Sequence, residues 1–563
     1  MYRPTPAEGA SPTDDTVEIP VIEPAAATAE RTTASNSLAM AAGSLVSRIT
    51  GFARTVMIGA ALGGTVGGLG DAYTTAQVLP GQIYELVLGA VGTSVLVPML
   101  VRRRKNEPDG GEAYSQGLLT FAAVILAAAA ALAVLAAPLL TAVYAGSRPE
   151  SYQDLVTVLS YLMLPMLFFT GMSVIIGAVL NVRGQFAAPM WVPIINNLTV
   201  IAACGVFIGL LTGRVDTTRM TPAQILVIGG GTLIGMAAQT VALLPALRKV
   251  GFRWRFRWQP RSLGLGELAQ LGGWMLLFVA ANQVAVFAVV KLLNTTDAGA
   301  GAGLLIYNNV FLLVMMAHGV IGVSVMTALL PRMSAAAADG RLRDLGGDVA
   351  RGMRTVIAAE APVVVVYAVL AVPLSVVLFR WGAFSADEAE ATARVLAVGA
   401  LAVLPLSLGY LANFSFYALR GNRTVALINV VAVAARVGMQ IAFVAMLDDS
   451  RTAMWLMLGT ALSYFVGDAI SLTLLRRRVG RLGLRATAAA GLRIAGAAVV
   501  AAGLGWLVLR LLPGGPQPSL GAALLQLAVG GVVILVTYLA LARALRVNEI
   551  TALLAMVRRR LGR

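Results

Sequence analysis

Two arginines in the first long apolar segment are the residues best placed to do chemistry. Residues 37–62 contain the run SRITGFAR from Ser47 to Arg54, so Arg48 and Arg54 lie at membrane depth. A charged side chain at the centre of a membrane helix costs about 2.5–3.5 kcal/mol on insertion scales. Such residues usually face a bundle interior or a watery cavity, where an anion can compensate them. The two arginines and Ser47 therefore predict a binding site for an anionic group.

The second apolar segment, residues 71–101, carries acidic residues that could partner these arginines. Glu85 is an ionisable group deep in this segment, which makes it the natural partner of Arg48. Asp71 lies near the outer surface, where Arg54 also belongs. We predict that the two carboxylates hold the two arginines when no anion is bound, and that they contribute to the substrate-binding site.

Two backbone positions predict bending or gating of these first helices. Pro80, in the middle of the second segment, removes a backbone hydrogen bond and is expected to kink the helix. Gly51 lies between the two arginines of the first segment, and we assign it to the same class of gating or kink position.

The other candidates for chemistry are few. Cys204 is the only cysteine and His318 the only histidine. This excludes an internal disulfide and predicts no metal site, no catalytic triad and no cofactor. His318 is interpreted as a packed polar residue, with a proton relay as the alternative. Arg436 and Asp468 are interpreted as an interhelical ion pair. The sequence therefore predicts a protein that is not an enzyme.

The composition identifies an integral membrane protein. Of the 563 residues, 58% are hydrophobic and 12% are charged. The apolar runs are continuous rather than alternating, which argues against a β-barrel and predicts an all-α polytopic protein. We expect 14 transmembrane helices, at residues 37–62, 71–101, 117–144, 154–181, 188–212, 222–247, 266–293, 303–330, 350–379, 392–419, 424–447, 453–475, 488–511 and 519–543.

The loop charges predict the orientation of these helices. With the N-terminus inside, the inner loops hold most of the loop lysines and arginines, as the positive-inside rule requires. The outer loops contain acidic residues such as Glu150, Asp154 and Asp387. We therefore expect both termini in the cytoplasm.

The formal net charge of +16 has a related explanation. In a soluble protein it would suggest nucleic acid, but here the charges lie in short loops, so no nucleic-acid partner is expected. The segment from Gly251 to Trp258 alternates arginine with aromatic residues directly after a span. This pattern is typical of an interfacial segment on anionic lipid headgroups.

A weak internal repeat divides the chain. The motif that ends at Pro98 recurs at Pro331, and Gly184 has its counterpart in Gly421 at almost the same spacing. Both halves begin inside, so the repeat is parallel. The predicted parts are a disordered cytoplasmic tail (1–36), an N-terminal lobe (37–247), a basic-aromatic cytoplasmic linker (248–265), a C-terminal lobe (266–475), two added helices (488–543) and a basic cytoplasmic tail (544–563).

Several motifs resemble those of the MurJ (MviN) lipid II flippases. The run from Ser47 to Arg54 resembles the signature in the first helix of that family. Supporting matches within residues 37–445 are Gly70-Asp71-Ala72, Leu79-Pro80, Val97-Pro98, Gly177–Asn181, Phe186, Pro189, Pro193, Asn196, Gly319–Val323, Leu330-Pro331, Phe416-Tyr417 and Thr424. By this resemblance Arg48, Arg54 and Asp71 occupy functional positions of the family.

The resemblance implies a bacterial plasma-membrane flippase of the multidrug/oligosaccharidyl-lipid/polysaccharide exporter superfamily. Such proteins have two six-helix lobes around a central cavity and work by alternating access. Their cargo in this branch is lipid II, the undecaprenyl-pyrophosphate-linked peptidoglycan precursor. Its pyrophosphate would lie among the cavity arginines and its tail in a groove formed by the last two helices. Cell-wall synthesis proteins are further expected partners.

The sequence departs from the family at several positions. An Arg-Arg pair and an acidic residue commonly follow Leu-Pro in the second helix, where this chain has Tyr84, Glu85 and Gly89. An Asp-Arg pair of the eighth helix is replaced by Phe311 and Leu312. The missing cations leave open a flippase for another lipid-linked polysaccharide, or a non-transporting scaffold that binds precursors. A cation-coupled drug antiporter is a further alternative, which the arginines of the first helix oppose.

Directional transport needs an energy input. A substrate that binds both facings of a carrier equally shifts no equilibrium. Net positive charge in the cavity makes the membrane potential one candidate, and a coupled monovalent cation is another.

Overall fold

The computed structural model describes residues 25–63, 68–89, 92–210, 220–263, 265–295, 303–447, 449–480 and 482–551. Every secondary-structure element within these ranges is a helix, which confirms the all-α prediction. A chain in lipid must satisfy its backbone hydrogen bonds internally, and helices do so within each segment. The abundant alanine and leucine are also strong helix formers.

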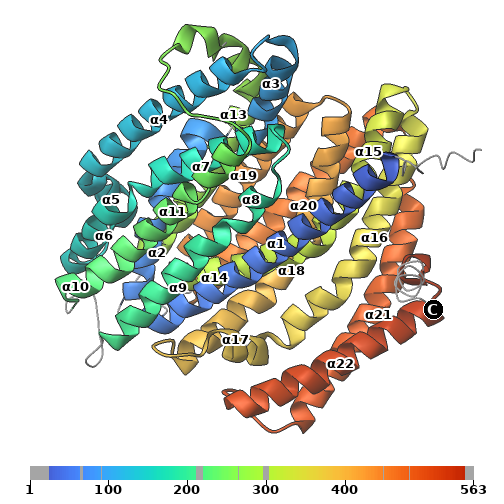
Figure 1. Ribbon diagram of the computed structural model, residues 1–563. Coiled ribbons are helices and arrows are strands. Elements are labelled where there is room, and N and C mark those ends of the chain that lie inside the picture. The colour runs from blue at the N-terminus through green and yellow to red at the C-terminus, as the bar shows by residue number, and fades with distance from the viewer. Residues whose placement is uncertain are drawn as a thin grey trace, which may run out of the picture.

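The first half of the chain forms a bundle around α9 and α7 (Figure 1). Proline residues divide several of its spans into consecutive pieces, because proline lacks the N–H that continues a helix. Its elements are α1 (Ala25–Leu62), α2 (Leu69–Tyr84), η1 (Glu85–Gly89), α3 (Gly92–Asn106), α4 (Glu112–Leu135), α5 (Ala137–Ala145), α6 (Glu150–Met163), α7 (Met166–Val182), α8 (Ala187–Trp191), α9 (Pro193–Gly209), α10 (Pro222–Ile225), η2 (Leu226–Gly230), α11 (Gly231–Val241), α12 (Leu244–Lys249) and η3 (Pro260–Leu263).

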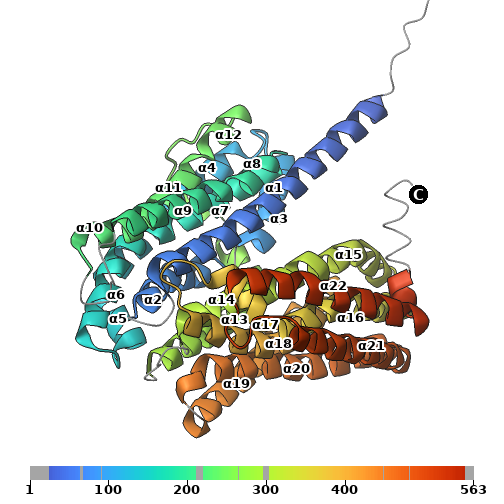
Figure 2. The same ribbon diagram turned by 90° about the horizontal axis from the view of Figure 1, so that it is seen from below.

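The second half packs around α18, which contacts α14, α16, α17 and α20. The last two helices, α21 and α22, pack on each other and against α16 and α17 (Figure 2). The elements are α13 (Leu265–Thr295), α14 (Leu304–Ala317), η4 (His318–Gly322), α15 (Val323–Ala338), α16 (Leu342–Val369), α17 (Ala371–Phe379), α18 (Ala386–Ala418), α19 (Asn422–Met446), η5 (Asp449–Arg451), α20 (Thr452–Val479), α21 (Leu484–Leu511) and α22 (Leu520–Ala544).

Thirteen helices of the described residues are long and apolar enough to cross a membrane. They correspond to thirteen of the fourteen predicted spans. The remaining prediction, residues 71–101, falls on α2, η1 and α3, between which residues 90 and 91 lie outside the described part.

One predicted boundary is wrong. Residues 25–36 were expected in a disordered tail, but they form the first turns of α1. Their sequence is rich in alanine, so it extends the helix beyond the apolar span although it is too polar to be part of it. The rest of the predicted tail, residues 1–24, lies outside the described residues.

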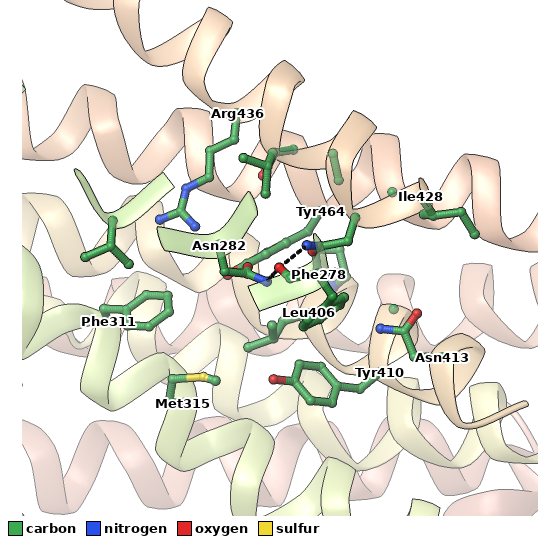
Figure 3. Close-up of a pocket in the computed structure, with 18 of the residues that line it drawn as sticks. Phe278, Asn282, Phe311, Met315, Leu406, Tyr410, Asn413, Ile428, Arg436 and Tyr464 are labelled. Atoms are coloured by element: carbon green, nitrogen blue, oxygen red, sulfur yellow. Dashed lines mark hydrogen bonds between the residues drawn. The ribbon is translucent and has the colours of Figure 1, made fainter. Parts of the chain in front are cut away.

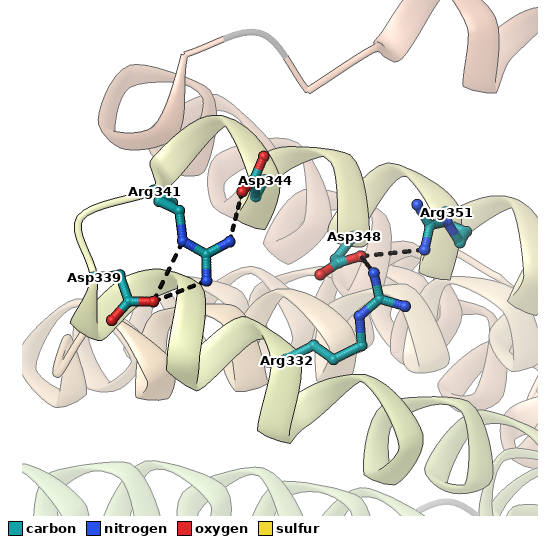
Figure 4. A network of polar contacts seen from close by, with 6 residues as sticks. All are labelled: Arg332, Asp339, Arg341, Asp344, Asp348 and Arg351. Atoms are coloured by element: carbon teal, nitrogen blue, oxygen red, sulfur yellow. Dashed lines mark hydrogen bonds and ion pairs between the residues drawn. The ribbon is translucent and has the colours of Figure 1, made fainter.

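Ion pairs lie on α15, on α16 and in the turn between these two helices (Figure 4). Asp348 of α16 is almost fully buried and accepts from Arg332 of α15 at 3.1 Å and from Arg351 at 3.4 Å. Beyond this pair, Arg341 binds two aspartates in the α15–α16 turn. Arg332 lies on α15 and Asp348 on α16, so their ion pair links the two helices.

The loop before α4 shows why that helix begins at Glu112. The carboxylate of Asp109 accepts the backbone N–H of Gly111 at 2.9 Å and of Ala113 at 2.8 Å. These two N–H groups lack partners within the helix, so the aspartate caps its first turn. The hydrogen bonds, that from Ala113 first, lower the pKa of the Asp109 carboxyl.

Candidate substrate-binding site

Helix α1 is held against α9 at the position of the predicted signature. The side-chain amide of Asn197, on α9, donates to the Ser47 carbonyl at 3.2 Å and to the Thr50 hydroxyl at 3.0 Å. A Cβ on Gly51 would lie 3.4 Å from the same amide nitrogen. Ser47 and Gly51 therefore lie where α1 packs on α9, and α1 continues through Gly51 without a break. Substrate binding by Ser47 and a gating role for Gly51 stay predictions.

Arg48 extends from α1 toward the second half of the protein. Its side chain is exposed, and its guanidinium lies against Gly319 in the π-helical turn η4, where a Cβ would overlap it. Within the described residues it has neither a hydrogen bond nor an ion pair, and its charge acts on the neighbouring His318. The structure thus places an unpaired cation where the two halves of the chain meet.

Arg54 points in another direction, as its spacing of six residues from Arg48 on a helix requires. It is half-buried, and its charge acts on Tyr73 of α2 and Cys204 of α9, both buried in the first half. Its Nε atom is buried without a hydrogen-bond partner. The structure leaves this second cation without a carboxylate partner in the described part of the chain.

The two predicted carboxylate–arginine pairs are wrong for this conformation. Glu85 belongs to η1 and forms no ion pair with Arg48. Asp71 is buried and its Oδ1 atom accepts the backbone N–H of Leu305 at 3.0 Å. The positive N-terminal end of α14 therefore occupies the place that the sequence assigned to Arg54.

The predicted kink position, Pro80, lies just before an irregular turn. Helix α2 contains Pro80 and ends at Tyr84, where the π-helical turn η1 begins. Proline and π-turns are the usual causes of sharp helix kinks. A gating role for Pro80 stays a prediction.

Contacts between the two halves gather at one end of the bundle. Asn294, near the end of α13, donates to Thr75 at 3.3 Å and accepts from the Tyr152 hydroxyl at 3.0 Å. Ser147 and Arg148 of the first half donate to carbonyls at the end of α13. We call this region the closed end, defined by Ala60, Asp71, Thr75, Ser147, Arg148, Tyr152, Asn294, Leu305, Gly382 and Ala383.

The α17–α18 loop completes the closed end. The backbone N–H of Ala383 donates to the carbonyl of Ala60, in the last turn of α1, at 2.8 Å. Gly382 precedes it with φ of +57°, and a Cβ there would overlap the same carbonyl. This close approach of two backbones requires glycine.

Gly382→Ala is expected to destabilise the protein by about 2 kcal/mol or more, because backbone strain of about 1–2 kcal/mol adds to the overlap with Ala60. The apparent thermal unfolding midpoint in nanodiscs measures this. Gly184→Ala is the matched control, since Gly184 has φ of +83° but nothing within 4 Å of a Cβ. Equal shifts of the unfolding midpoint in the two variants would show that the close contact of Gly382 with Ala60 contributes nothing to stability.

A cavity of about 440 Å³ lies within the second half (Figure 3). It is lined by α13, α14, α18, α19 and α20, with Val78 of α2 at its edge. Arg436 donates to the Tyr307 hydroxyl at 2.8 Å, and its Nε atom is buried without a partner. Asp468 lines the same cavity beside Gly409.

The predicted Arg436–Asp468 ion pair is wrong, because the structure gives these side chains different neighbours. Within the described residues, Arg436 is instead a third cation without a carboxylate partner, whereas the sequence predicts a structural role for it. In the sequence, only the position of Arg436 within an apolar segment could have indicated a binding role. Across the described residues, no group of three or more His, Cys, Asp or Glu side chains could hold a metal ion.

The chain matches the model of the lipid II flippase MurJ family over residues 58–517. A probable lipid II flippase MurJ of Buchnera aphidicola subsp. Baizongia pistaciae is 22% identical over 424 residues, covering 75% of this chain and 80% of the relative. The lipid II flippase MurJ of Burkholderia cenocepacia is 26% identical over 392 residues, covering 68% and 72%.

The fold is similar to that of solved transporters. A lipid II flippase MurJ in an inward closed conformation superposes with a TM-score of 0.71 at 16% identity, covering 90% of this chain and 99% of the other. An inward-facing multidrug resistance MATE family transporter of the MOP superfamily gives a TM-score of 0.63 at 14% identity, covering 77% and 95%.

Proposed function

The chain belongs to the lipid II flippase MurJ family, and from this premise we propose that Arg48 and Arg54 bind the pyrophosphate of lipid II during its transfer between membrane leaflets. The family is one of transporters rather than enzymes. Lipid II is a peptidoglycan precursor, so the proposed role is in cell-wall synthesis.

The observation that carries the proposal is the guanidinium of Arg48, which lies between the two halves of the chain and has no ion-pair partner in the described part of it. An isolated cation at membrane depth is unfavourable unless an anion or water compensates it. Arginine donates to phosphate oxygens in a fixed fork, which makes it suited to bind a pyrophosphate. Arg54, half-buried and without a carboxylate partner among the described residues, offers a second donor on the same helix.

The closed end supports alternating access. Its hydrogen bonds join α2, α6 and the α5–α6 loop of the first half to α13 and α14 of the second. Transfer requires these bonds to break while contacts form at the opposite end. We assign the closed end to the outer side, because the basic loops at the opposite end are expected in the cytoplasm.

The basic-aromatic segment supports a plasma-membrane location with anionic lipid at the inner surface. Trp254 donates to Thr120 of α4 at 3.3 Å, which fixes the segment to the first half. Phe256 and Trp258 are exposed, as are the arginines Arg253, Arg255 and Arg257 of this segment. Aromatic rings and arginines in this arrangement suit the headgroup region.

Transport in one direction requires an energy input in addition to lipid II binding. The arginines give the site a net positive charge, so we propose that the membrane potential contributes, at about 2.3 kcal/mol per charge per 100 mV. A coupled monovalent cation is the second source that we propose.

Complementation tests the proposed function. A bacterial strain depleted of its own lipid II flippase should grow when it expresses this chain, with membrane insertion verified. Growth is expected because the chain would restore delivery of the precursor. A well-expressed, folded chain that fails to support growth would contradict lipid II as the cargo and favour another lipid-linked polysaccharide or a scaffold role.

A further inference from the structure

Three buried polar side chains of the second half form a continuous hydrogen-bonded chain. The Ser407 hydroxyl, on α18, donates to Glu360 Oε1, on α16, at 2.6 Å. His318 Nδ1, in η4, lies 2.8 Å from the same hydroxyl oxygen. Glu360 and Ser407 are 0% exposed and His318 is 3% exposed. We call these residues the Glu–Ser–His chain.

The backbone is built to bring these three side chains together. A Cβ on Gly322 would lie 2.8 Å from both His318 Nδ1 and Ser407 Oγ, and 3.2 Å from Glu360 Oε1. The π-helical turn His318–Gly322 further departs from the regular helix at this point. Such turns often occur at functional sites, and here the turn and its glycine leave room for the chain.

The charged and titratable groups around the chain are few. Arg48 of α1 acts on His318, the Tyr410 ring of α18 lies 4.4 Å from the His318 ring, and Tyr538 of α22 donates to the Ala358 carbonyl of α16. Asp468 of α20 lies against Gly409, two residues from Ser407. The arginines that α15 and α21 contribute are exposed: Arg332, Arg485, Arg493 and Arg510.

No cation of the described residues forms an ion pair with Glu360, and its second oxygen is buried without a hydrogen-bond partner. A buried carboxylate in this setting is unfavourable unless it binds a proton or a partner of opposite charge. We propose that the Glu–Ser–His chain binds one proton, and that it takes up this proton when the anionic headgroup of lipid II binds Arg48. The proposal rests on the proposed function.

The two hydrogen bonds of the Glu–Ser–His chain allow a proton to be relayed from His318 to Glu360. A proton from water binds His318 Nε2, the ring nitrogen outside the chain. The Nδ1–H bond then breaks as an Oγ–H bond forms on Ser407, while the original Ser407 proton moves to Glu360 Oε1. The imidazole ends neutral, with its Nδ1 lone pair accepting from Ser407, and Glu360 ends as a neutral acid.

Arg48 links this proton to the cargo. Its positive charge disfavours any further positive charge on the adjacent chain. An anion bound to Arg48 cancels that effect, so lipid II binding should promote proton uptake. By thermodynamic reciprocity, proton binding must strengthen lipid II binding by the same factor by which lipid II binding strengthens proton binding.

The test measures lipid II binding to the purified full-length protein in nanodiscs between pH 6 and 8. Because typical coupling factors exceed about fivefold, wild-type affinity should fall about fivefold or more as the pH rises and the chain loses its proton. Glu360→Gln keeps an acceptor for Ser407 but cannot titrate, so its affinity should vary less than twofold. His318→Gln should also flatten the profile.

Asp468→Asn is the matched control, because it removes another buried carboxylate of the same half and should keep the wild-type pH dependence. The proposal is overturned if Glu360→Gln retains the wild-type slope or if Asp468→Asn abolishes it. Binding that is independent of pH but lost in Arg48→Ala contradicts the proton proposal alone. Absence of binding by the wild type at every pH removes the proposed function as well.

Discussion

Arg48→Ala is expected to weaken lipid II binding about 30-fold or more and to abolish growth of the depleted strain. The guanidinium has no carboxylate partner in the described structure, so its removal takes away a positive charge that is free to bind the pyrophosphate. Losing one charge-assisted contact of this kind typically costs about 2 kcal/mol or more, which is about 30-fold in affinity. Binding of lipid II to the purified variant in nanodiscs measures the effect.

Two further variants separate the charge from its geometry. Arg48→Lys keeps the charge but loses the fork of donors, so its affinity should lie between those of the wild type and alanine. Arg343→Ala removes an exposed arginine near the start of α16 and should bind lipid II as the wild type does. An Arg48→Ala protein with wild-type affinity would contradict the assigned role of Arg48.

Asp71→Ala is expected to loosen the closed end. The buried Asp71 carboxylate accepts the Leu305 N–H at the start of α14, and hydrogen bonds to charged groups contribute about 1.5–3 kcal/mol. Loss of about 2 kcal/mol should speed local opening roughly 30-fold. Hydrogen exchange of backbone amides in the first turns of α14 measures this, with Leu305 the most affected.

The same experiment has a graded variant and a control. Asp71→Asn keeps an acceptor but not the charge that favours a helix N-terminus, so it should be intermediate. Asp387→Ala changes an exposed aspartate in the first turn of α18 and should leave the exchange of α14 unaltered. Unchanged exchange in Asp71→Ala would show that this contact does not hold the closed end together.

The helices were predictable because each continuous apolar run must form one in lipid. The start of α1 was missed, since Ala25 to Asn36 is helical without being apolar. The π-turns at Glu85 and His318 were also missed, because no residue pattern distinguishes them from regular helix.

The site was predictable only in part. The unusual position of Arg48 and Arg54 in an apolar run identified them without any contact information. The partner of Asp71 is a backbone N–H more than two hundred residues away in sequence, and a backbone group leaves no mark on the sequence. For the same reason the approach of Gly319 to Arg48 could not be foreseen.

His318 shows how distance in sequence hides a cluster. Its partners Ser407 and Glu360 lie on two other helices, and each looks like an isolated polar residue in its own span. Composition favoured a packed histidine, and the structure does pack it. Only the three-dimensional structure shows that the His318 ring is linked through the Ser407 hydroxyl to the Glu360 carboxylate.

Transfer of fluorescent lipid II across proteoliposome membranes is the most direct measurement of whether the α1 arginines carry the headgroup. The exposed fraction of the label, read by a membrane-impermeant quencher, reports transfer over time. The wild type should equilibrate the label between leaflets, while the Arg48→Ala/Arg54→Ala double variant should match protein-free vesicles. Transfer by the double variant at the wild-type rate would contradict the central role of these arginines.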